Sequence, residues 1–216
     1  MFSNAAPKFI KRIFLLFFLA NQFQIFSQNT ALDSLQTYTK KDTVRVNLLN
    51  GAATKIVTSD IGKALQLYKE SELLSDALQY KKGKAYSLFH AGRAQITKAD
   101  YNASINYFQN ALTVYEELKD KEGIANCYLN IGRANYYLVD FPKALDNFKH
   151  AVTISDEAGK LKITSNALMI MGMIYSAEGD RDKALEYYKK AISIDEKTGN
   201  KKGMSTILIN LGNLYK

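Results

Sequence analysis

The sequence predicts an all-α protein built as a stack of antiparallel helix pairs, an α-solenoid. Three observations lead to this prediction. Residues of the same type recur every 40 positions along most of the chain. The apolar residues inside each repeat follow the three-to-four-residue spacing of amphipathic helices. Only 2 prolines and 12 glycines occur in 216 residues, which is too few for a loop-rich β protein.

The 40-residue step is kept by residues of several kinds. Glycines, aspartates, branched apolar residues, aromatic residues and small residues each recur at a fixed place in the repeat. The six sets are Gly92, Gly132, Gly172 and Gly212; Asp60, Asp100, Asp140 and Asp180; Leu65, Ile105, Leu145 and Leu185; Tyr68, Phe108, Phe148 and Tyr188; Ala64, Ser104, Ala144 and Ala184; and Ser71, Ala111, Ala151 and Ala191. Such agreement over four or five units is not composition noise, so the repeat is the structural unit.

Each repeat is predicted to contain two helices. In the third repeat, apolar residues from Ile124 to Tyr137 follow helical spacing, and this helix should end near Val139. Asp140 is suited to cap the next helix, because its carboxylate can accept a hydrogen bond from an unpaired backbone N–H. Pro142 then lies in the first turn, where its missing N–H costs nothing. The same anatomy predicts helices near 44–57, 60–77, 84–98, 100–118, 162–178 and 180–198, with a half-unit from about 203 to 216.

The small residues have a structural role in this prediction. Glycine or alanine at the tight positions lets two helices approach closely, and the aromatic residues fill the gap between one pair and the next. A single pair cannot bury its apolar side alone, so the stack is the stable unit. We therefore expect a large residue in place of Gly132 to splay the third pair.

The N-terminus carries the pattern of an export signal. Three basic residues within the first twelve positions precede the apolar run IFLLFFLA at 13–20. This run has the size of a signal-peptide core and is shorter than the roughly 20 apolar residues that span a bilayer. We predict a signal peptide over 1–27, cleaved after Ser27, and an exported protein that is periplasmic or on the extracytoplasmic face of the inner membrane. An uncleaved membrane anchor is the alternative.

The composition argues against several kinds of chemistry. A single cysteine, Cys127, cannot form an intrachain disulfide or a cysteine-based zinc site. Two histidines, His90 and His150, leave little material for nucleophile–base catalysis, and no glycine-rich phosphate loop or zinc-protease helix occurs. We expect no enzyme activity, metal or cofactor within these residues. The net charge of +8 is scattered rather than clustered, which argues against a nucleic-acid partner.

With these features, the sequence resembles the tetratricopeptide repeat (TPR) family over residues 44–216, after a lead-in segment at 28–43. The clearest copy is NIGRANYYLVDFPKALDNFKHA at 130–151. The resemblance implies a right-handed TPR superhelix of about four 40-residue units plus the first helix of a fifth. The period of 40, rather than the usual 34, is similar to that of the longer-helix subclass in kinesin light chains and bacterial peptide-sensing regulators.

In TPR arrays the first helix of each pair lines the concave surface, which binds extended peptides or partner helices. The register implies a first column of groove residues: Asn50, His90, Asn130, Ile170 and Asn210. A side-chain amide offers a donor and an acceptor together, so it can hold a peptide backbone whatever the peptide's sequence. The alternative is that these amides bond to neighbouring helix backbones.

A second column holds Arg93 and Arg133, one repeat apart, followed by Met173. Two guanidiniums on one wall could hold a carboxylate bidentately. Solvated or intramolecularly paired arginines are the alternative. The third group is apolar and aromatic: Phe89 with Tyr86, Tyr136 and Tyr137 nearby. Such residues suit the side chains of a bound peptide. Packing between repeats is the alternative.

The last segment, MSTILINLGNLYK, is more apolar than the polar outer face with which repeat arrays usually end. Either the chain is a fragment, or a partner or self-association through this helix covers it. The segment KDTVRVNLLN at 41–50 resembles the opening of bacterial TPR-containing sensor histidine kinases and TPR-linked membrane cyclases.

Two functional hypotheses follow. The first is an exported, non-catalytic scaffold whose groove binds a protein or peptide partner in extended form. The second is the truncated extracytoplasmic sensor region of a membrane signalling enzyme whose output domain is missing here. In either case the membrane is reached only through the signal segment or a downstream helix.

Overall fold

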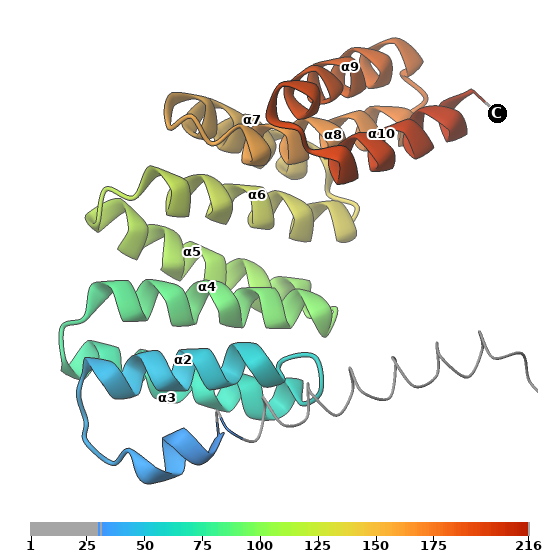
Figure 1. Ribbon diagram of the computed structural model, residues 1–216. Coiled ribbons are helices and arrows are strands. Elements are labelled where there is room, and N and C mark those ends of the chain that lie inside the picture. The colour runs from blue at the N-terminus through green and yellow to red at the C-terminus, as the bar shows by residue number, and fades with distance from the viewer. Residues whose placement is uncertain (1–29, 31, 216) are drawn as a thin grey trace, which may run out of the picture.

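The structure is a computed structural model that describes residue 30 and residues 32–215, so the predicted signal peptide lies outside it. The all-α stack of antiparallel pairs is confirmed (Figure 1). The helices run in the order α2 (Thr43–Ile56), α3 (Ile61–Ala77), α4 (Lys81–Thr97), α5 (Tyr101–Glu117), α6 (Lys121–Tyr137), α7 (Phe141–Glu157), α8 (Leu161–Ala177), α9 (Arg181–Thr198) and α10 (Lys201–Leu214). We call the even-numbered helices, first in each pair, the A helices, and the odd-numbered ones the B helices.

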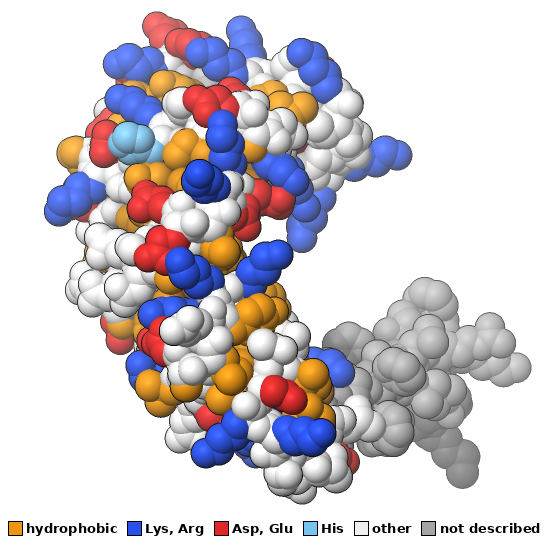
Figure 2. Space-filling model, turned by 90° about the vertical axis from the view of Figure 1, so that its left-hand side faces the viewer, with side chains coloured by type: hydrophobic (Ala, Val, Ile, Leu, Met, Phe, Trp, Pro, Cys, Tyr) orange, Lys and Arg blue, Asp and Glu red, His pale blue; other side chains and the backbone are white. Residues whose placement is uncertain are grey.

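The A helices lie on the inside of a curved stack. Each of the A helices α2, α4, α6 and α8 packs along the B helix that follows it and also contacts the next A helix. Among the described elements, successive B helices make no such contact. Helices that approach one another line the inner side of a curve, so the A helices form its concave wall. Figure 2 shows the hollow in profile, with basic side chains along its border.

Aspartate caps start the B helices, as predicted for Asp140. The carboxylates of Asp60, Asp100, Asp140 and Asp180 accept a hydrogen bond from the backbone N–H three residues later, at 2.9–3.2 Å. Pro142 lies in the first turn of α7. These side chains satisfy backbone donors that a helix start otherwise leaves unpaired.

Two A helices start earlier than the sequence pattern predicts. Helix α4 begins at Lys81 rather than at 84, and α10 begins at Lys201 rather than at 203. Their first turns carry lysines, which apolar periodicity does not register. For α10 the start is set by Asn200, whose Oδ1 accepts from the Gly203 N–H at 3.2 Å.

The glycine column lies where two helices come closest. A Cβ added to Gly92, Gly132 or Gly172 would lie 2.9, 2.7 or 2.6 Å from the ring of an aromatic residue on the following B helix. Real Cβ atoms do not come this close to another heavy atom, so only glycine fits. The rings are those of Phe108, Phe148 and Tyr188, all fully buried. The role predicted for the small residues is therefore confirmed. The aromatic rings, however, pack inside each pair against the glycine of the same repeat, where the sequence analysis predicted them between one pair and the next.

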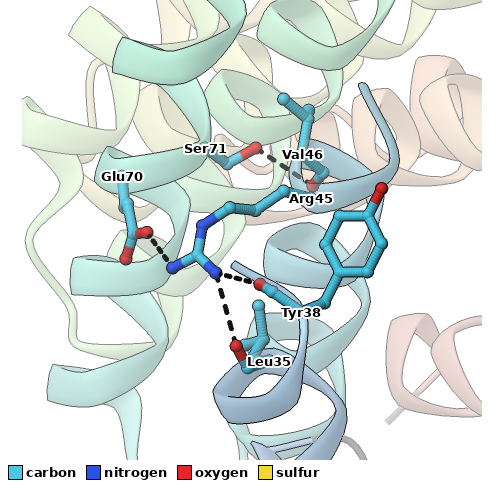
Figure 3. Close-up of polar contacts among 6 residues, drawn as sticks. All are labelled: Leu35, Tyr38, Arg45, Val46, Glu70 and Ser71. Atoms are coloured by element: carbon cyan, nitrogen blue, oxygen red, sulfur yellow. Dashed lines mark hydrogen bonds and ion pairs between the residues drawn. The ribbon is translucent and has the colours of Figure 1, made fainter. Parts of the chain in front are cut away.

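The lead-in segment is tied to the first pair by Arg45 (Figure 3). Its guanidinium donates to the carbonyls of Leu35 at 3.3 Å and Tyr38 at 2.6 Å, and it pairs with the carboxylate of Glu70 on α3 at 2.7 Å. Asp42 caps α2 and accepts from the Tyr38 hydroxyl at 2.7 Å. Two residues of the 41–50 segment thus have structural roles.

We expect Arg45→Ala to release the lead-in segment from the array. Hydrogen bonds from a charged donor contribute roughly 1.5–3 kcal/mol each when partly buried, so local opening should become easier by about 2 kcal/mol. Hydrogen exchange of the amides at 35–38 measures this directly. Glu70→Gln, which weakens only the ion pair, should have a smaller effect. Unchanged exchange in Arg45→Ala would show that the apolar contacts of Leu35 hold the segment instead.

Candidate binding groove

The predicted groove residues lie on one face of the A helices. On α4, Tyr86, His90 and Arg93 are spaced by four and three residues, which places them on the same side of the helix. Gly92 and Leu88 occupy the other side and are buried against neighbouring helices. On this face His90 stacks on Tyr68 of the B helix α3, with ring centroids 6.1 Å apart, whereas Arg93 is exposed. We infer from the curvature of the stack that the exposed part of this face belongs to the concave wall.

The predicted residues differ in exposure. Tyr86, Arg93, Arg133 and Tyr137 are exposed; Phe89, His90, Tyr136 and Met173 are half-buried; Asn50 and Asn130 are buried. The exposed group, two arginines and two tyrosines, is divided between α4 and α6. The structure thus places the accessible chemistry on two adjacent A helices in the middle of the array.

Arg93 and Arg133 are not used by the fold. In the described part of the chain, neither guanidinium takes part in a hydrogen bond or an ion pair with an acidic side chain. Arg45, by contrast, binds two carbonyls and a carboxylate. The structure therefore excludes intramolecular pairing for these two arginines, whereas solvated arginine, the other part of the alternative, agrees with it as well as a groove clamp does. Two solvated guanidiniums at the same place in successive repeats leave all their donors open to a ligand.

An aromatic cluster lies beside Arg93. The His90 and Tyr86 rings are stacked with centroids 4.0 Å apart, and Phe89 meets His90 edge-on at 5.5 Å. Burial lowers the pKa of His90 from 6.5 to about 4, and the nearby charge of Arg93 adds to this effect. The imidazole is therefore neutral near pH 7. The cluster offers flat, uncharged surface next to a positive charge.

Two asparagines of this column use their donors within the fold, whereas the third, Asn210, has a buried Nδ2 without a hydrogen-bond partner among the described residues. Asn130 Nδ2 donates to the carbonyl of Asn126, one turn earlier in α6, at 2.8 Å. Asn50 Nδ2 lies 3.4 Å from the carbonyl of Gly83 on the next A helix. Both side chains bond to helix backbones, the structural alternative for this column. We therefore give the amide groups no part in the proposed function.

Two groove-side contacts were not found from the sequence. Thr54 of α2 lies 3.0 Å from the Tyr68 hydroxyl and 3.3 Å from the Tyr86 hydroxyl, linking the first two repeats. Tyr101, the first residue of α5, stacks on Tyr137 with centroids 5.1 Å apart.

The repeat pattern could have indicated the position of Tyr101. An apolar residue follows the capping aspartate in three repeats: Ile61, Tyr101 and Phe141. Tyr136 stacks on Phe141 at 6.0 Å, so it belongs to inter-helix packing.

Within the described residues, no helix has both the length and the apolar character needed to cross a membrane. No three histidine, cysteine, aspartate or glutamate side chains in that part of the chain are placed to share a metal ion.

Sequence comparisons identify the family. A tetratricopeptide repeat profile matches residues 83–157, and a second tetratricopeptide repeat profile matches residues 165–198. A comparison with curated proteins finds no match. The two matched segments begin on A helices and end on B helices, in agreement with the repeat boundaries of the structure.

Solved structures share the fold at low sequence identity. Aspartyl phosphate phosphatase F from Bacillus subtilis matches with a TM-score of 0.74 and 18% identity, over 78% of this chain and 45% of its own. A Rap protein complexed with Competence and Sporulation Factor matches with a TM-score of 0.74 and 17% identity, over 89% and 55%. Kinesin light chain TPR-like repeats from Podosopora anserina match at 0.65 and 14%, over 85% and 94%. This chain spans about half the length of the first two proteins. Its repeats, its stacked helix pairs and the matching profiles together show that the chain belongs to the tetratricopeptide repeat family.

Proposed function

We propose that this chain is a non-catalytic binding scaffold whose concave face holds an acidic peptide segment in extended form. One observation carries the proposal: Arg93 and Arg133 present unpaired guanidiniums at equivalent places on adjacent A helices. A guanidinium binds a carboxylate through two parallel hydrogen bonds, so the pair selects negatively charged groups. One of the matched structures is a Rap protein complexed with Competence and Sporulation Factor, which supports a ligand-binding role for this chain.

The flanking rings define what lies beside the acidic group. Tyr86 stacks on His90 next to Arg93, and Tyr137 stacks on Tyr101 near Arg133. Exposed aromatic rings contribute contact area with little loss of conformational entropy. We infer a ligand with apolar side chains next to its carboxylates.

The N-terminal pattern supports a cellular location for this binding. A basic segment followed by a short apolar run at 13–20 supports export, with the array outside the inner membrane. The resemblance of 41–50 to sensor kinase openings supports the second candidate, in which the same groove is the input site of a signalling enzyme.

The double variant Arg93→Ala/Arg133→Ala tests the groove. Isothermal titration with a nine-residue peptide containing two glutamates between leucine and phenylalanine should show binding roughly 10- to 100-fold weaker than to the native chain, because several charge-assisted hydrogen bonds are lost. The helical circular dichroism signal should stay unchanged, since both side chains are exposed and neither takes part in a hydrogen bond or ion pair of the described chain. Added salt should weaken the native interaction.

Two controls make the result specific. Lys149→Ala/Lys189→Ala removes the same charge from exposed positions on B helices, also one repeat apart, and should leave binding unchanged. A peptide with glutamine in place of both glutamates should bind the native chain and the arginine variant with equal affinity. Equal affinity of both peptides for the native chain would contradict the proposal.

A further inference from the structure

A cavity of about 480 Å³ lies beside the candidate groove. Its lining residues come from three successive helices in the middle of the stack (Figure 1): Lys82 and Tyr86 of α4, Tyr115 and Leu118 at the end of α5, and Asp120 before α6. We call it the Tyr115 pocket. Tyr86 and Arg93 are two turns apart on one face of α4, so the pocket borders the face that carries this arginine.

The inner part of the Tyr115 pocket is aromatic and apolar. The Tyr115 ring lies against Gly123 of α6, where an added Cβ would collide with it. Phe89 meets the same ring edge-on, with centroids 6.4 Å apart. Leu118, like Tyr115, is half-buried and packs on the core, and Tyr86 is 38% exposed. A side chain that enters therefore exchanges water for rings and a leucine, which favours an apolar occupant.

The next junction along the array, between α6 and α8, has a different chemistry. The residues one repeat after Lys82, Tyr86, Tyr115 and Leu118 are Glu122, Asn126, Ser155 and Ala158. Glu122 there forms an ion pair with Lys160, which occupies the place of Asp120. In the described chain no ion pair joins Lys82 to Asp120, whose carboxylate instead accepts from the Gly123 N–H at 3.0 Å. The apolar lining is thus not repeated at the next junction.

The Tyr115 pocket and the two arginines lie at opposite ends of the same pair of A helices. Lys82 and Asp120 stand at the starts of α4 and α6, whereas Arg93 and Arg133 lie in their second halves. The midpoint between Lys82 and Tyr86 is nine residues before Arg93, which is about 14 Å at a rise of 1.5 Å per residue. Four residues of an extended chain span about 13 Å, and an even separation places both side chains on one face.

We propose that the Tyr115 pocket holds a large apolar side chain of the same peptide whose acidic group binds Arg93 and Arg133, and that these two peptide residues are four positions apart. This inference rests on the function proposed above and adds a sequence requirement to it. The peptide residues next to the acidic one face the Tyr86 and His90 rings. Tyr86 borders both that cluster and the pocket, so the two places form one continuous surface.

Two peptides of identical composition test the spacing. In the spaced peptide, acetyl-Glu-Thr-Ser-Thr-Trp-Thr-Ser-Thr-Glu-amide, the tryptophan lies four positions from a glutamate in both chain directions. In the compact peptide, acetyl-Thr-Ser-Thr-Glu-Trp-Glu-Thr-Ser-Thr-amide, both glutamates adjoin the tryptophan. Threonine favours the extended conformation. The protein contains no tryptophan, so the emission of the complex at tryptophan wavelengths comes from the peptide ring.

The native chain should bind the spaced peptide roughly tenfold more tightly than the compact one, which is the gain expected from burying one aromatic side chain. At saturation the emission of the spaced peptide should move to shorter wavelength, because its ring leaves water. The emission of the compact peptide should shift less, since its tryptophan cannot reach the pocket while a glutamate binds the arginines. Arg93→Ala/Arg133→Ala should weaken both peptides.

A matched pair of variants locates the apolar residue. Leu118→Ser makes the pocket floor polar and should bring the affinity for the spaced peptide down to that for the compact one. Leu78→Ser makes the same change one repeat earlier, outside the pocket, and should keep the tenfold preference. Circular dichroism verifies that both variants remain helical.

The possible failures separate the pocket from the groove. Equal affinity of the native chain for the two peptides, with both weakened in the arginine variant, would overturn the pocket and leave the groove function intact. A tenfold preference that persists in Leu118→Ser, or an unshifted emission of the spaced peptide, would also overturn the pocket. Binding that the arginine variant does not weaken, or no binding of either peptide to the native chain, would overturn both proposals.

Discussion

Gly132→Leu should destabilise the array by about 3 kcal/mol or more, whereas Gly212→Leu should have almost no effect. A Cβ at Gly132 would lie 2.7 Å from the ring of Phe148, and that ring is fully buried with no room to retreat. Inserting carbon atoms into a filled core commonly costs roughly 1–3 kcal/mol, and the two helices here meet at their closest point. Gly212 has the same place in its repeat, but no facing side chain.

Alanine at the same two glycines should give effects of opposite sign. Alanine favours helix over glycine by up to about 1 kcal/mol, so Gly212→Ala should stabilise α10 slightly. At Gly132 the steric clash outweighs this gain, and Gly132→Ala should destabilise the array.

Urea unfolding followed by circular dichroism measures the stability of the leucine and alanine variants. Hydrogen exchange locates the opening in α6 and α7. Phe148→Ala combined with Gly132→Leu should recover part of the loss, because the leucine then fills the space left by the ring. An unfolding midpoint for Gly132→Leu equal to that of the native chain would contradict this packing.

The fold could be predicted because its determinants are local and repeated. A glycine opposite an aromatic residue and an aspartate at a helix start each recur every 40 residues, so period and residue type together specify the helix pairs. The starts of α4 and α10 were predicted two or three residues late, because lysine-rich first turns carry no apolar signal. The sequence also showed that the last segment is apolar, but only coordinates show that the space opposite Gly212 is open.

The candidate groove could be predicted only in part. The TPR resemblance and the register together predicted Arg93 and Arg133 on the inner face, since positions 40 residues apart occupy the same place in a regular array. Register cannot say whether a polar side chain is already used, and the amides of Asn50 and Asn130 proved to be bonded to backbone carbonyls. Thr54 was missed because its partners lie on two other helices, a relation that no spacing in the sequence encodes.

Acidification should weaken the first half of the array through His90. Burial in the cluster with Tyr86 and Phe89 lowers the pKa of this imidazole from 6.5 to about 4. The unfolded chain therefore binds a proton below pH 6.5 that the folded chain does not bind until about pH 4. Stability is consequently constant above pH 6.5 and falls as the pH drops from 6.5 towards 4, by up to about 3 kcal/mol for a shift of this size.

His90→Asn should remove this part of the pH dependence, because asparagine occupies the same place in the first and third repeats and does not titrate. Urea unfolding midpoints are measured at steps between pH 7 and pH 4. Near pH 7 the midpoints of the native chain and the variant should differ only through the lost ring contacts. As the pH falls, the midpoint of the native chain should decrease more than that of the variant. His150→Asn serves as the matched control, since that histidine is exposed on a B helix with its side chain 55% accessible. If His90→Asn and the native chain lose stability in parallel from pH 6.5 to 4, the imidazole is solvated in solution and the cluster beside Arg93 is more open than the structure shows.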